Sequence, residues 1–287
     1  MYKGEVEPML APLAVKVQEQ IIQKILEKYP DKYILKIGSV GKKRDDMYNN
    51  DIDIAIKCES IDELRSLAYD VFGEENVTSV WSFYMMSVKY AYEIEYDDSI
   101  QTGTTVCDLI LMKDVAYTMF RYDAPYLNES KYKTGMKIMF VHILLNYCDK
   151  ELNEGIDDDH YAKFDFTPIG LYRYICNKND IKDWKKEFVT SDVHKIMNMI
   201  FYDPNIEDFH TIESLWKLIH SDKFKYKDSV KSFEITWFIE TYRKGWYSIK
   251  PEDFKLDYFT VDEINEILDN YRLEHLINMM LYNGIET

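Results

Sequence analysis

The first part of the chain places apolar residues at helical spacing. Val17, Ile21 and Ile25 fall on one side of residues 13–28, with mostly polar residues elsewhere. This spacing predicts an amphipathic helix. Pro30 is expected to end it, because proline cannot continue a helix.

Period-two alternation of apolar residues follows this helix and predicts strands. A second helix is expected between the second and third strands, with Ser60 as N-cap, Glu63 at the capping-box position and Gly73 at its end. Helix and strands together predict a mixed α/β domain spanning residues 1–114. The strands are expected at 33–39, at 51–57, within 81–96, and at 105–112.

The pattern changes after residue 114, where helical spacing dominates. Residues 128–150 give the clearest helix, and the acidic stretch 153–168 separates it from later ones. The predicted fold class is therefore α+β, with an N-terminal mixed sheet flanked by helices and a C-terminal helical domain over residues 115–287. Further helices are expected near 168–178, 181–202, 206–221, 228–245 and 260–282.

Length, cysteine spacing and net charge indicate where the protein is found and which partners it can bind. The chain has 287 residues, of which 46% are hydrophobic, enough for a substantial core. Its four cysteines are widely spaced, and no apolar run reaches the roughly 20 residues that cross a bilayer. We therefore expect a cytoplasmic protein with no membrane partner. The net charge of −16 disfavours long duplex DNA but permits a nucleotide or a short RNA.

Two carboxylates interrupt the strand predicted at 51–57. Asp51 and Asp53 would project from one face, while Ile52 and Ile54 point to the other. Asp108 is a further carboxylate, alone among apolar residues of the strand at 105–112. Unpaired carboxylates repel one another, and a hard divalent cation such as Mg²⁺ relieves that repulsion. Asp51 and Asp53 also fit an ordinary pair exposed to water.

A Gly-Ser pair closes the preceding strand. Gly38 permits close approach of the backbone to a phosphate, and Ser39 offers a hydroxyl and an N–H donor. A turn hydroxyl at the end of a strand is the simpler interpretation of Ser39. Lys42, Lys43 and Arg44 follow, either as added positive charge or as a solvated loop.

Together these residues resemble the DNA polymerase β-like nucleotidyltransferase superfamily, in its template-independent branch. The family signature is a Gly-Ser that ends one strand, an Asp-x-Asp on the next and a third Asp on a later strand. Gly38-Ser39, Asp51-Ile52-Asp53 and Asp108 match it, and the resemblance covers residues 33–112.

The resemblance implies two Mg²⁺ or Mn²⁺ ions held by Asp51, Asp53 and Asp108, which would be both catalytic and metal-binding. It also implies a nucleoside triphosphate donor, with ATP favoured, and a helical domain that closes one side of the nucleotide cleft. Similar enzymes use a lysine from the first helix after the catalytic domain to contact the triphosphate. Lys133 and Lys137 are the candidates, and a solvated basic stripe is their simpler interpretation.

The function expected is a metal-dependent nucleotidyltransferase that moves a nucleoside monophosphate from the triphosphate to a hydroxyl acceptor and releases pyrophosphate. The acceptor is expected to be compact (a nucleotide, a small molecule or a protein) or a short RNA or tRNA. The alternative is a non-catalytic nucleotide-binding sensor or interaction protein that retains the fold. Tyr172 and Arg173 fit either contact with a nucleotide or ordinary packing and surface charge.

Overall fold

The protein is described by a computed structural model, which shows a mixed α+β fold with several sheets and helices. The chain divides into two compact units, residues 1–225 and 226–287. The domain boundary predicted at 114/115 falls within the first unit and stays a prediction. No helix among the described residues is long and apolar enough to cross a membrane. The structure describes residues 8–41, 48–122, 134–148, 152–180, 182–209 and 211–243.

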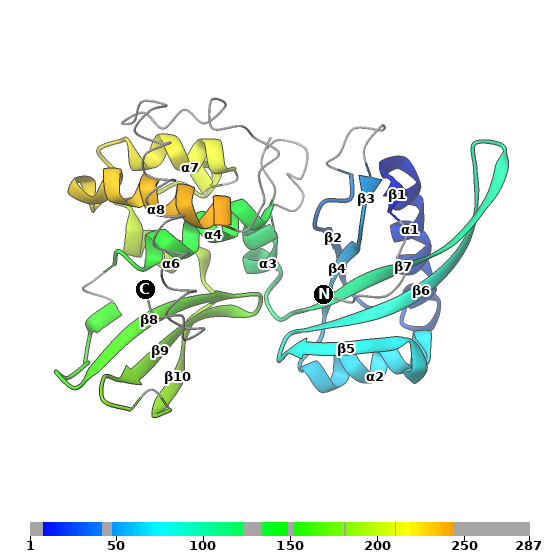
Figure 1. Cartoon of the computed structure of the whole chain (residues 1–287), viewed down its shortest axis with the longest axis horizontal. Helices are drawn as coiled ribbons and strands as arrows, with labels where there is room; N and C mark the ends of the chain where they lie inside the picture. Colours follow the sequence, from blue (N-terminus) through cyan, green and yellow to red (C-terminus); the bar gives the residue numbers. More distant parts are fainter. Residues whose placement is uncertain are drawn as a thin grey trace, which may run out of the picture. The chain divides into compact units, whose positions relative to one another are not determined.

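A five-stranded sheet forms the N-terminal part of the first unit, with the strand order β2-β4-β7-β6-β5 (Figure 1). β4 and β7 run parallel, and the other neighbouring pairs are antiparallel. The predicted strands are confirmed, with β6 in the region of the third, whereas β5 lies mostly before that region and was not predicted. The strands are β2 (Ile34–Ile37), β4 (Ile52–Lys57), β5 (Val77–Ser82), β6 (Met85–Tyr96) and β7 (Ser99–Met112).

One face of this sheet is covered by helices α1 (Ala11–Lys28) and α2 (Ile61–Phe72). Their apolar residues join the sheet residues Ile52, Ile54 and Ile56 in one buried cluster. Because β4 places alternate residues on opposite faces, Asp53 points to the other face. That other face has its own small cluster, made of Ile37, Ala55, Ile110, Met112 and Tyr122.

The predicted ends of α2 are confirmed. Ser60 is its N-cap and its hydroxyl accepts a hydrogen bond from the Glu63 N–H at 3.1 Å, while Gly73 is the C-cap at φ 87°. The reciprocal half of the capping box differs from the expectation. The Glu63 carboxylate accepts from the Glu59 N–H at 2.7 Å and also pairs with Lys32.

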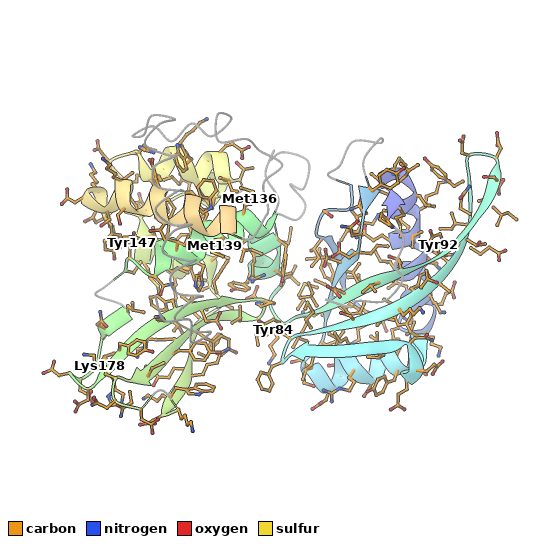
Figure 2. All side chains as sticks on the ribbon, viewed as in Figure 1. Tyr84, Tyr92, Met136, Met139, Tyr147 and Lys178 are labelled. Atoms are coloured by element: carbon orange, nitrogen blue, oxygen red, sulfur yellow. The ribbon has the colours of Figure 1, made fainter. Side chains whose placement is uncertain are left out.

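The β6–β7 hairpin continues well beyond the rest of its sheet (Figure 1). Asp97 and Asp98 form its tip, both at positive φ. Tyr92, labelled in Figure 2, lies opposite Gly103 in the register, and its ring occupies the space that a side chain at Gly103 would need. Lys16 and Gln20 of α1 donate hydrogen bonds to carbonyls on the outer edge of β6. A two-residue antiparallel pair, β1 (Met9–Leu10) with β3 (Tyr48–Asn49), completes this part.

After β7 the first unit continues with helices and a second sheet. In helix α3 (Val115–Tyr122), Tyr117 Oη donates to the Thr167 carbonyl at 2.6 Å and Arg121 donates to the Phe166 carbonyl at 3.0 Å. These bonds tie α3 to the first strand of the second sheet. The helices are α3 (Val115–Tyr122), α4 (Thr134–Leu145), α6 (Val193–Ile200) and α7 (Ile212–Ile219).

The second sheet was not expected. It has three antiparallel strands in the order β10-β9-β8, inside the region predicted to be helical. The helix predicted near 168–178 and the first part of the one at 181–202 are therefore wrong. In β9 the alternation of apolar and polar residues is hidden, because Tyr172 and Tyr174 lie on one face of the strand and Leu171 and Ile175 lie on the other. The strands are β8 (His160–Thr167), β9 (Gly170–Asn177) and β10 (Trp184–Thr190).

In the second unit the structure describes a short 3₁₀ helix, Lys227–Ser229, followed by α8 (Val230–Arg243). The helix predicted at 228–245 is confirmed over the described part. The helix predicted at 260–282 lies outside the described residues.

Candidate active site

Asp53 and Asp108 lie side by side in the centre of the five-stranded sheet. β4 and β7 are parallel neighbours, and Asp53 is in register with Asp108. Residues in register on adjacent strands project from the same face, with backbones about 4.8 Å apart. The structure therefore brings together two predicted carboxylates that are separated by more than fifty positions in the sequence.

Asp51 lies immediately before β4 and adds a third carboxylate to this site. It raises the pKa of both Asp53 and Asp108 through its negative charge. All three side chains are partly buried. The three carboxylates are thus close enough to interact electrostatically from two separate points of the chain.

Burial sets the charge state of the central pair. Burial is the largest cause that raises the pKa of Asp53 well above its usual range, and repulsion from Asp51 and then Asp108 adds to it. Burial also raises the pKa of Asp108, followed in size by the opposing hydrogen bond from Ser87, which lowers it, and by repulsion from Asp51, which raises it. The fold holds these carboxylates where their ionised forms are costly.

Ser87 positions one of the carboxylates. It lies on β6 directly opposite Asp108, and its hydroxyl donates to Asp108 Oδ1 at 2.5 Å. Ser87 is buried. Sequence reasoning missed this residue; the available signal was a single small polar residue within the apolar run Met85–Val88 at the start of β6.

Gly38 makes room for the Asp53 carboxylate. Ile37 is in register with Asp53, and Gly38 follows at φ +81° as the chain leaves β2. A Cβ built on Gly38 would collide with the Asp53 carboxylate and lie 2.8 Å from the Asp53 Cβ. A glycine is therefore required both by the backbone conformation and by the neighbouring acid.

Ser39 is held by an asparagine that sequence reasoning also missed. Asn49 Nδ2 donates to Ser39 Oγ at 2.9 Å, and Asn49 is completely buried on the short strand β3. Within the described residues, Asn49 Oδ1 has no hydrogen-bond partner. Gln18 of α1 adds a further support by donating to the Asp53 carbonyl at 3.0 Å. Side chains from two separate elements, Asn49 of β3 and Gln18 of α1, thus support the Gly-Ser turn and the strand that carries Asp53.

Tyr122 approaches the same face of the sheet from α3. It belongs to the small cluster with Ile37, Ala55 and Ile110. Burial raises the pKa of Tyr122 to about 12, while Arg121 lowers it and Asp53 raises it further. An un-ionised phenol therefore lies within electrostatic range of the carboxylates.

Of the two lysines predicted to bind the triphosphate, the structure describes only Lys137. Lys133 lies outside the described residues, as do Lys42, Lys43 and Arg44. Lys137, on α4, is buried with 1% of its surface exposed, and its ammonium donates to the Phe120 carbonyl at 2.5 Å. It also lies 4.6 Å from the centre of the Phe120 ring. Its role as a nucleotide ligand stays a prediction.

The donor set at the site suits a hard cation. Carboxylate oxygens are the ligands that Mg²⁺ prefers, and two partly buried carboxylates with raised pKa values gain most from a neutralising charge. Across the described residues, no group of three or more His, Cys, Asp and Glu side chains is already arranged as a metal site.

Comparison with known proteins adds no family assignment. No family model matches the chain, and no curated protein matches it either.

Proposed function

We propose that the chain is a divalent-metal-dependent nucleotidyltransferase. The observation that supports it best is the in-register pair Asp53 and Asp108, with Asp51 beside them and with raised pKa values for the pair. Burying like charges together destabilises a fold unless a ligand compensates for it, so such a pair favours a cation-binding role. The resemblance of Gly38-Ser39, Asp51, Asp53 and Asp108 to the polymerase β-like signature supplies the reaction class.

In the proposed reaction an acceptor hydroxyl forms a bond to the α-phosphorus of a nucleoside triphosphate. The bond between the α-phosphorus and the oxygen bridging to the β-phosphorus breaks, and pyrophosphate leaves. The hydroxyl proton passes to Asp108 and then to solvent. A raised pKa suits Asp108 to this task, because a general base works best when its pKa approaches the working pH.

The side chains around the pair have positioning roles in this proposal. Ser87 holds Asp108 Oδ1 and so leaves Oδ2 to receive the proton. Gly38 keeps the space that the Asp53 carboxylate occupies, and Asn49 orients the Ser39 hydroxyl. Asp51, Asp53 and Asp108 would hold Mg²⁺ or Mn²⁺, which would neutralise charge on the triphosphate and on the leaving pyrophosphate.

ATP is the proposed donor, and the acceptor is a compact molecule or a short RNA. The net charge of −16 supports the choice of acceptor, because a strongly acidic chain repels long duplex nucleic acid.

The test measures pyrophosphate release and product labelling from each α-labelled nucleoside triphosphate with Mg²⁺ or Mn²⁺. Asp53→Asn and Asp108→Asn are expected to lower turnover by about 10²- to 10³-fold, the usual loss when a main electrostatic group is removed. Asp98→Asn is the matched control, because Asp98 lies exposed at the hairpin tip and asparagine tolerates its positive φ.

Two outcomes would contradict the proposal. Equal turnover of the Asp53→Asn, Asp108→Asn and Asp98→Asn variants would remove the carboxylate pair from the chemistry. Nucleotide binding without any pyrophosphate release, with every triphosphate and with extract as the source of acceptors, would favour the non-catalytic sensor instead. Calorimetric titration with Mg²⁺ and Mn²⁺ measures ion binding independently of turnover.

A further inference from the structure

The three-stranded sheet has two faces of different character. Phe164, Phe166, Leu171 and Ile175 are buried on one face, with exposed fractions of 6% or less. The register places the alternate residues on the opposite face. The second face is where the sheet meets solvent.

Aromatic residues and a lysine gather on this second face. We call it the aromatic face and define it by Tyr172 and Tyr174 of β9 and by Trp184, Lys186 and Phe188 of β10. In the register, Phe188 lies opposite Tyr172 and Lys186 lies opposite Tyr174. The rings contact in pairs, Tyr172 with Phe188 and Tyr174 with Trp184, each at 5.4 Å between centroids.

Lys186 stands between the two tyrosines. Its ammonium lies 4.4 Å from the Tyr172 ring centre and 4.8 Å from that of Tyr174, and it forms a 3.4 Å ion pair with Asp165 of β8. Lys163 adds a second ammonium on the same face, 5.7 Å from the Tyr161 ring. The face thus alternates π surfaces with positive charge.

The outer residues of the aromatic face remain open to solvent. Trp184 is 54% exposed and Phe188 57% exposed. Large aromatic side chains this exposed leave hydrophobic surface in water, and their grouping on one face marks an interaction surface. Figure 2 shows side chains along both surfaces of this sheet, with Lys178 at its outer end.

Charge indicates the chemistry of the partner. On the side of the sheet that carries the aromatic face, the charged strand residues are Lys163, Lys186 and Asp165, a net charge of +1, in a chain whose net charge is −16. A second copy docking through the same face would bring two such positive regions together. A polyanion with flat rings matches both the charge and the aromatic residues.

We propose that the aromatic face binds a single-stranded nucleic acid by stacking its bases. Alternate residues along a strand lie about 6.6–6.8 Å apart, and adjacent strands about 4.8 Å apart, so two or three extended bases can each meet a ring. Base stacking on aromatic side chains tolerates any sequence, and the lysines pair with the phosphates between the bases. The bound strand would then supply the acceptor hydroxyl of the proposed transfer, and only this step rests on the proposed function.

The experiment measures fluorescence anisotropy of labelled 12-nucleotide single-stranded RNA and DNA with the full chain, and of a duplex of the same sequence. The single strands are expected to bind at least 10-fold more tightly than the duplex. Phe188→Ala and Trp184→Ala are expected to weaken binding by about 5- to 150-fold each. Lys186→Gln is expected to flatten the salt dependence by about 0.7 in the log–log slope, the value for one phosphate contact on a single strand.

Tyr202→Ala is the matched control. Tyr202 is 60% exposed and has Lys225 at 5.5 Å from its ring, but it follows α6 and lies outside the sheet. It is expected to leave binding unchanged. Phe188→Leu keeps most of the apolar area and removes the ring, so a loss of binding in that variant identifies stacking rather than general hydrophobic contact.

Several outcomes would overturn the proposal. They are equal binding by the Phe188→Leu and Tyr202→Ala variants, no binding of either single strand, or a dimer in solution that Trp184→Ala dissociates. Asp53→Asn, for which the proposed function expects a greatly lowered turnover, is expected to bind the strand as tightly as the unchanged chain. Failure of nucleotide transfer and failure of strand binding are therefore separate results.

Discussion

In the five-stranded sheet, carboxylates lie among apolar, buried residues. In the three-stranded sheet, aromatic rings lie on the face that solvent reaches. In the first sheet, Asp53 and Asp108 lie next to Ala55 and Ile110. In the second, Phe188 is more than half exposed while Phe164, on the opposite face of the sheet, is 2% exposed. Each sheet thus has side chains that folding alone would not select.

The difference between the two sheets concerns the kind of ligand. Buried carboxylates gain from a small, strongly charged ion, because a cation removes their repulsion. Exposed rings gain from a flat partner that covers them without requiring the protein to move. The buried carboxylates therefore favour a small cation, and the exposed aromatic rings favour a flat, apolar ring system.

The largest expected effect is on the free energy of unfolding, and it differs between the two faces of the three-stranded sheet. Phe164→Ala is expected to lower the free energy of unfolding by about 3–5 kcal/mol, because it leaves a cavity in a buried cluster. Phe188→Ala is expected to change it by about 0.5 kcal/mol or less, as for other exposed positions. Urea titrations followed by circular dichroism measure both. Similar losses in the two variants would show that Phe188 contributes to folding, and would weaken its assignment to a binding surface.

A smaller effect tests the acid site through its glycine. Gly38→Ala is expected to lower the free energy of unfolding by about 2–4 kcal/mol, from positive φ and from collision with the Asp53 carboxylate. Gly41→Ala has nearly the same φ, +82°, but its Cβ meets no described atom within 4 Å, so it is expected to cost only about 1–2 kcal/mol. Equal costs would mean that the carboxylate moves away freely.

The smallest effect concerns the charge of the acid pair. The pKa of Asp53 is raised in the folded protein above its unfolded value, so the folded state binds its proton more tightly. The free energy of unfolding therefore falls as pH rises from about 4 through the raised pKa. Without divalent ions, Asp53→Asn is expected to melt about 2–4 °C higher than the unchanged chain at pH 8, the shift for about 1 kcal/mol.

This gap is expected to shrink toward pH 4 and to vanish below the unfolded pKa, where Asp53 is protonated in both states. Asp98→Asn serves as the control with an exposed acid, and thermal melts in a chelating buffer provide the measurement. Adding Mg²⁺ is expected to stabilise the unchanged chain more than Asp53→Asn. A variant that melts lower than the unchanged chain at pH 8 would contradict the assignment of repulsion to this pair.

Sequence patterns predicted the N-terminal part well because each of its signals is local. Ser60 and Gly73 define a helix through its own capping, and alternation defines β4 through the two faces of one strand. Asp51, Asp53 and Asp108 stood out because carboxylates are rare among buried apolar residues. Ser87 and Asn49 did not, because their importance comes only from the distant side chains that they contact.

The three-stranded sheet escaped prediction for a different reason. Strand prediction relies on a polar residue at every second position, but in β9 Tyr172 and Tyr174 occupy those positions. Apolar spacing that is nearly continuous fits a buried helix as well as a strand. The two tyrosines that belong to the aromatic face therefore concealed the central strand that carries them. β8 does alternate, and sequence reasoning missed it because it lies within the stretch 153–168 interpreted as a break between helices.

The order of the strands in the first sheet has a consequence for biosynthesis. β7 is the last of the five to leave the ribosome, yet it occupies the middle position, between β4 and β6. A nascent chain that has not yet released β7 holds Asp51 and Asp53 without the acid that faces them. The three carboxylates therefore come together only after the insertion of this central strand, and a chain truncated before it would lack the third of them.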